Sequence, residues 1–89
     1  MTAERVIVRG EVQRVGFRWF VQSQAEAAGL TGWVCNLADG AVEAHLEGDS
    51  AAIERVVTAL RKGPPRSQVT AVERTPCAPQ RPVGFRIAR

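Results

Sequence analysis

The chain has 89 residues, of which 45% are hydrophobic and 24% are charged, and this balance is typical of a single globular domain over residues 1–89. A core of this size leaves little room for a deep cavity, so we expect any functional site near the surface. Twelve Lys and Arg residues against nine Asp and Glu residues give a formal net charge of +3, which favours anionic partners. With two cysteines and no apolar run near the ~18 residues of a membrane span, we expect a cytoplasmic protein without a disulfide framework, targeting segment or membrane contact.

The first half of the chain predicts a strand, a helix and a hairpin. Residues 5–13 are rich in β-branched side chains and predict a strand, although Ile7 breaks the alternation. Residues 17–28 carry apolar side chains at helical spacing, and Gly29 is placed to end that helix. Two strands are then expected over residues 30–36 and 41–47, because the Asp-Gly pair at 39–40 favours a hairpin turn between them.

The strand at residues 41–47 alternates apolar side chains with Glu43, His45 and Glu47. This alternation predicts one buried face and one exposed face, and it places His45 on the exposed face.

The second half of the chain predicts a helix and two further strands. Asp49 or Ser50 can cap a helix that ends at the Gly-Pro-Pro sequence of residues 63–65. A strand over 69–75, a proline-rich loop over 76–82 and a short strand over 84–87 follow.

The resulting order β-α-β-β-α-β predicts an α+β fold of the ferredoxin-like type. This fold has an antiparallel sheet with two helices on one face, here with a short C-terminal strand. The second and fourth strands are not neighbours in this topology, so we expect no disulfide between Cys35 and Cys77. Because the fold hosts many unrelated functions, function must be argued from the site.

Residues 10–18, with the sequence GEVQRVGFR, lie where the first strand passes into the first helix. The backbone N–H groups at a helix start lack partners and favour an anion. Gly16 lets the loop curl so that these groups converge, and Arg18 adds a guanidinium able to hold phosphate oxygens bidentately. Asn36 ends the next strand, and its amide is able to position a water molecule. Periodicity leaves open whether Arg18 and Asn36 meet.

Both segments resemble signatures of the acylphosphatase family. The first matches G-x-V-Q-G-V-x-F-R at every fixed position but one, where Arg14 replaces glycine. The second, over residues 32–48, resembles G-[FYW]-[AVC]-[KRQAM]-N-x3-G-x-V-x5-G, except that Cys35 occupies a position that normally holds another residue. With the length and the element order, the resemblance covers essentially the whole chain.

The resemblance implies an enzyme that hydrolyses acyl phosphates to a carboxylate and inorganic phosphate. Arg18 would clamp the phosphate oxygens, and Asn36 would orient the attacking water. The loop backbone that would bind the substrate phosphate comes from Gln13, Arg14, Val15, Gly16, Phe17 and Arg18. Inorganic phosphate would be both product and inhibitor, and the family implies a monomer that needs no metal or cofactor. If the position of Arg14 requires a positive φ, arginine is strained there.

Two other functional classes share features with this sequence. RNA recognition motifs share this element order and favour positive charge, but they present aromatic residues on the third strand, which here is acidic and has none. A non-catalytic acylphosphatase-like domain of a larger maturation enzyme is the other alternative, and the length of the chain argues against it.

Other kinds of site have little support in the sequence. Neither cysteine has an arginine six positions later, and one histidine with two scattered cysteines offers no metal cluster. Trp19 and Trp33 are interpreted as packing or flanking residues and receive no functional role.

Overall fold

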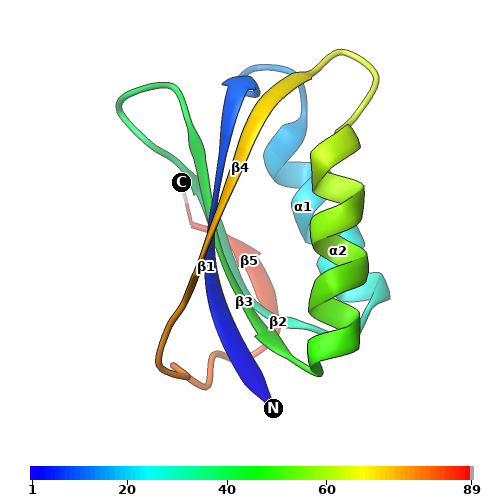
Figure 1. Cartoon of the computed structure of the whole chain (residues 1–89), viewed down its shortest axis with the longest axis vertical. Helices are drawn as coiled ribbons and strands as arrows, with labels where there is room; N and C mark the ends of the chain where they lie inside the picture. Colours follow the sequence, from blue (N-terminus) through cyan, green and yellow to red (C-terminus); the bar gives the residue numbers. More distant parts are fainter. Residues whose placement is uncertain (89) are drawn as a thin grey trace.

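The computed structural model describes residues 1–88, in which two helices cover one face of a five-stranded sheet (Figure 1). The strands follow the spatial order β4-β1-β3-β2-β5. In chain order the elements are β1 (Thr2–Glu11), α1 (Phe17–Ala27), β2 (Thr31–Asn36), β3 (Val42–Gly48), α2 (Ser50–Lys62), β4 (Gln68–Pro76) and β5 (Phe85–Ile87). The predicted ferredoxin-like order is confirmed. Since β5 pairs with β2 in parallel while the other pairs are antiparallel, the sheet is mixed.

The core lies between the helices and the sheet because each helix turns one apolar face toward the strands. In α1 the buried residues Phe17, Val21 and Ala25 follow a four-residue spacing, which places them on one side of the helix. Burying one large apolar side chain contributes about 1.5–3 kcal/mol, so these contacts fix α1 on the sheet. The residues of α2 and the sheet that complete this layer include Val6, Val8, Val34, Val42, Leu46, Ile53, Val57 and Leu60.

The turns and helix ends follow the local chemistry of the sequence. The Asp39 carboxylate accepts a hydrogen bond from the Ala41 N–H at 3.0 Å and closes the turn between β2 and β3. Gly29, with φ 75°, follows the end of α1, and α2 begins after Asp49, whose side chain makes no capping hydrogen bond. Neither helix has the length and apolar content needed to cross a membrane in the part of the chain that is described.

The predicted exposure of His45 is wrong, since its side chain is only 2% exposed. The segment over residues 77–84, between β4 and β5, covers this part of the face opposite the helices. The Trp33 ring stacks on the His45 ring at 6.0 Å between centroids, and Glu47 accepts hydrogen bonds from the backbone N–H groups of Gln80 and Arg81. Glu47, also expected on the exposed face, is only 5% exposed, and its Oε1 lies 2.8 Å from His45 Nε2. Strand alternation failed here because it cannot detect a covering segment that is distant in sequence.

Cys35 lies in β2 and Cys77 directly follows the end of β4, so the two cysteines are not on neighbouring strands, as expected. Strands β1 and β3 separate β2 from β4, and no disulfide joins Cys35 and Cys77 in residues 1–88. Burial and then the charge of Glu47 raise the pKa of the Cys77 thiol, so it stays protonated at neutral pH and is a weak nucleophile.

Candidate active site

The loop between β1 and α1 and the hairpin between β2 and β3 lie at the same end of the sheet (Figure 1). Both β1 and β2 are antiparallel to β3, so they run in the same direction, and their C-terminal ends lie at the same end of the sheet. The Gln13 side chain joins the two loops, because its Nε2 donates to the carbonyl oxygens of Leu37 at 2.8 Å and Ala41 at 2.9 Å. The topology therefore answers the question that the sequence left open and brings Arg18 and Asn36 to one site.

A pocket of about 190 Å³ opens between these elements. Its lining contains two arginines, Arg14 and Arg18, and no carboxylate among the described residues. The residues that line it are Val12, Arg14, Gly16, Phe17, Arg18, Trp19, Asn36 and Ile87. This charge distribution favours an anionic ligand.

The loop backbone adds uncommitted hydrogen-bond donors to this pocket region. Within residues 1–88, the N–H groups of residues 14–19 donate to no other group of the chain. Arg14 and Gly16 have left-handed φ angles of 65° and 78°, and such alternation along a loop is typical of a nest of converging N–H groups. Because the positive end of the α1 dipole is added to these donors, the loop is suited to bind phosphate.

Arg14 adopts the left-handed conformation that glycine tolerates without strain. For a residue with a Cβ this conformation costs about 1–2 kcal/mol. The strain anticipated for this family departure is therefore present, and the arginine adds a positive charge beside the loop.

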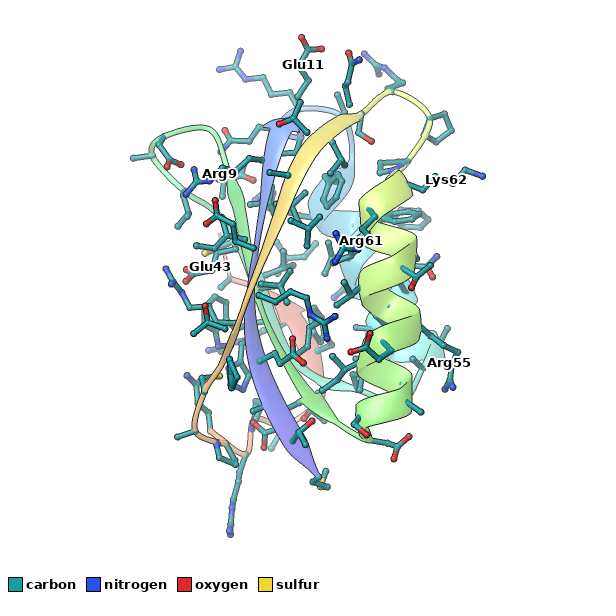
Figure 2. All side chains as sticks on the ribbon, viewed as in Figure 1. Arg9, Glu11, Glu43, Arg55, Arg61 and Lys62 are labelled. Atoms are coloured by element: carbon teal, nitrogen blue, oxygen red, sulfur yellow. The ribbon has the colours of Figure 1, made fainter. Side chains whose placement is uncertain are left out.

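Arg14 and Arg18 differ electrostatically from the nearby Arg9. Figure 2 shows Arg9 and Glu43 on the side of the sheet away from the helices. Arg9 pairs with Glu73 at 2.8 Å and with Asp39 at 3.0 Å, whereas Arg14 and Arg18 form no ion pair within residues 1–88. The Ala41 N–H and then Arg9 lower the pKa of the Asp39 carboxyl. The two pocket arginines therefore have no carboxylate partner among the described residues that would compete with an anionic ligand.

Asn36 brings a buried acceptor to the same pocket. Its Oδ1 is inaccessible to solvent and accepts no hydrogen bond from any described residue. An unsatisfied buried polar atom costs about 1–3 kcal/mol, and such atoms in native structures often serve a function. Because Asn36 lines the pocket, a rotation of its side chain would turn this acceptor toward a water molecule bound beside the anion.

The structure separates the expected site residues into two groups. Five of them line the pocket, namely Arg14, Gly16, Phe17, Arg18 and Asn36. Gln13 and Val15 do not line it: Gln13 holds the hairpin, and Val15 packs against the core.

Sequence reasoning missed three lining residues, Val12, Trp19 and Ile87. The sequence interpretation assigns Trp19 no role, although a large aromatic residue on the solvent side of a helix is a signal that can identify a binding residue. No group of three His, Cys, Asp or Glu side chains within residues 1–88 is placed to hold a metal ion.

Comparison with known proteins identifies the family of this chain. A sequence model of the Acylphosphatase family matches residues 4–87. The chain is 48% identical to an acylphosphatase of Chlorobaculum tepidum, with 82% of each chain covered, and 42% identical to one of Acidiphilium cryptum, covering 96% of this chain and 93% of that one. The crystal structure of an acylphosphatase from Bacillus subtilis superposes over the full length of both chains with a TM-score of 0.97 and 41% identity. The chain belongs to the acylphosphatase family.

Proposed function

We propose that this pocket hydrolyses the carboxyl-phosphate bond of acyl phosphates and releases a carboxylate and inorganic phosphate. One observation carries the proposal: three features meet at one small pocket. They are unpaired loop N–H groups, an Arg18 without a carboxylate partner among the described residues, and Asn36, whose Oδ1 accepts no hydrogen bond from them. The first two features suit a phosphate, and the third suits a water molecule. Membership of a hydrolase family supports the same reaction class.

The loop and Arg18 hold the phosphate in this mechanism. The backbone N–H groups of residues 14–18 donate to its oxygens, and the Arg18 guanidinium donates to two of them in a bidentate arrangement. Negative charge on these oxygens is redistributed as the bond to the acyl group breaks. Donors fixed in advance by the loop and by α1 stabilise that charge without having to reorganise.

Asn36 orients the nucleophile in this mechanism. Its Oδ1 accepts a hydrogen bond from a water molecule, which leaves a lone pair of the water oxygen facing phosphorus. The new P–O bond forms as the bond to the acyl oxygen breaks, and the electron pair of that bond leaves with the carboxylate. The proton of the water passes to a phosphate oxygen. Since a carboxylate is a good leaving group, positioning and charge stabilisation supply the catalysis, and neither a metal nor a cofactor takes part.

The proposal extends to the state in which the chain works. The groups that the mechanism needs, namely the loop, Arg18 and Asn36, meet within a single chain, so a monomer suffices as the active unit. We also place it in the cytoplasm, where thiols such as Cys77 stay reduced. Size-exclusion chromatography with light scattering tests the first point, because a stable dimer at assay concentration would contradict it.

The experiment measures phosphate release from acetyl phosphate in ¹⁸O-labelled water, for wild type, Arg18→Ala and Arg55→Ala. Arg55 is a matched control because it is an exposed arginine that projects from α2 (Figure 2). Wild type should turn over and place the label in phosphate, Arg18→Ala should lose about 100-fold or more in kcat/KM, and Arg55→Ala should stay within twofold. A folded wild type without turnover, or label in the carboxylate, would overturn the proposal.

A further inference from the structure

The pocket has an apolar side that phosphate binding does not explain. Trp19, which is 66% exposed, and Ile87, which is 38% exposed, line it from α1 and β5. The other large hydrophobic residues exposed to this degree in residues 1–88 are Met1 and Val83, and neither lines this pocket. Single exposed apolar side chains are common, but two beside one cationic pocket are typical of a ligand site with an apolar part.

Packing does not account for the position of Trp19. The core side of α1 carries Phe17 and Val21, and Trp19 lies two residues from each, which is roughly 200° around the helix. Its ring makes no aromatic contact with another described residue. An exposed indole that stabilises neither the core nor an aromatic pair is available to cover a ligand.

Ile87 is held next to the same site by β5. It pairs with Val34 in the parallel ladder, and Asn36 lies two residues farther along β2 on the same face. The Ala88 N–H donates to the Val34 carbonyl at 2.7 Å, and Gln22 Nε2 donates to the Phe85 carbonyl at 3.1 Å. These bonds fix β5 against β2 and α1, so Ile87 has a fixed position beside the pocket.

We propose that Trp19 and Ile87 form a subsite for the acyl group, which selects acyl phosphates with an aromatic or large apolar acyl group over those with a small one. This inference rests on the proposed function, because it assumes that the phosphate occupies the loop and Arg18. The acyl group of such a substrate then extends away from the loop toward the rest of the lining. The face of an indole stacks well on an aryl ring, and Ile87 adds apolar contact area.

The first test compares benzoyl phosphate with acetyl phosphate in wild type, Trp19→Ala and Val83→Ala. Trp19 is exposed and outside the core, so its truncation should leave the fold intact, and Val83 is a matched exposed apolar residue away from the pocket. We expect Trp19→Ala to lower kcat/KM about tenfold for benzoyl phosphate and less than twofold for acetyl phosphate. Val83→Ala should change neither value. Equal losses on both substrates, or no loss on either, would overturn the subsite.

The second test measures binding without catalysis. Isothermal calorimetry compares 2-oxo-2-phenylethylphosphonate with 2-oxopropylphosphonate, in which a CH₂ group replaces the bridging oxygen and blocks hydrolysis. Wild type should bind the phenyl compound about tenfold more tightly, and Trp19→Ala should lose this preference. If wild type hydrolyses acetyl phosphate but binds both phosphonates equally, the subsite is wrong and the proposed function stands. If it neither hydrolyses acyl phosphates nor binds either phosphonate, the proposed function fails and the subsite fails with it.

Discussion

Replacing Arg14 with glycine should make the protein more stable and bind phosphate more weakly. The left-handed φ of 65° costs arginine about 1–2 kcal/mol, which glycine does not incur. Glycine loses more conformational freedom on folding, which offsets about 0.5–1 kcal/mol of this gain. The net increase in the free energy of unfolding is therefore about 1 kcal/mol, or a rise of about 4–8 °C in Tm for a domain of this size.

The same substitution removes a positive charge from the pocket lining. A pair of unit charges about 4 Å apart contributes about 1 kcal/mol in water, so the inhibition constant of phosphate should rise about fivefold at low ionic strength. Screening should reduce this difference at 0.15 M salt.

The assay combines thermal unfolding, followed by circular dichroism, with phosphate inhibition at two salt concentrations. Arg14→Lys is the matched control, because lysine keeps both the charge and the strained backbone. It should resemble wild type in Tm and in phosphate inhibition. A lower Tm for Arg14→Gly would refute the assignment of strain, and unchanged inhibition would refute the role of the charge.

Three further predictions concern positioning, stability and product inhibition. Gln13→Ala removes two hydrogen bonds to the hairpin that carries Asn36, so it should lower kcat by a larger factor than it raises KM. It should also lower the free energy of unfolding by about 1–3 kcal/mol. The control Gln68→Ala, at an exposed position, should change neither the kinetic constants nor the stability. The hydrogen bond from His45, and then that from the Gln80 N–H, lower the pKa of Glu47 below the usual glutamate value of 4.5. The folded protein therefore binds fewer protons than the unfolded chain near this pH, so the stabilisation by Glu47 is complete above about pH 4.5 and is lost as pH falls through the folded pKa. The urea midpoint of Glu47→Gln should accordingly lie below that of wild type at pH 7 and approach it in acid, and a difference that grows in acid would contradict this sign. Inorganic phosphate should inhibit acetyl phosphate hydrolysis competitively in steady-state kinetics, and no inhibition at high phosphate would count against the loop site.

Much of the fold could be predicted because its signals are local. The apolar spacing of Phe17, Val21 and Ala25 identifies α1, and the Asp39-Gly40 pair identifies the hairpin. The parallel pairing of β5 could not be read locally, because it depends on where the segment after β4 returns to the sheet. The burial of His45 was missed for the same reason, since residues 77–84 that cover it lie more than thirty positions away in the sequence.

In the candidate site, too, some residues could be predicted from local sequence, while others depend on how distant segments pack. The loop and Arg18 have a recognisable pattern because consecutive residues build the anion site, and Asn36 could be proposed from its signature. Their meeting at one pocket required the common direction of β1 and β2. Trp19 and Ile87 were missed because their shared location exists only after β5 packs beside β2 and α1. The catalytic roles of Arg18 and Asn36 stay predictions.

The most direct test of the mechanism is the turnover of Asn36→Ala at saturating acetyl phosphate. Misplacing a reacting group by about 1 Å can lower the reaction rate about 100-fold. Loss of the group that orients the water should therefore lower kcat by at least this factor. The thermal midpoint should not fall, because the substitution removes a buried acceptor that has no partner in the described chain. A folded Asn36→Ala variant with kcat about 100-fold below wild type is the predicted result, and a kcat within twofold of wild type would contradict the role of Asn36 in catalysis.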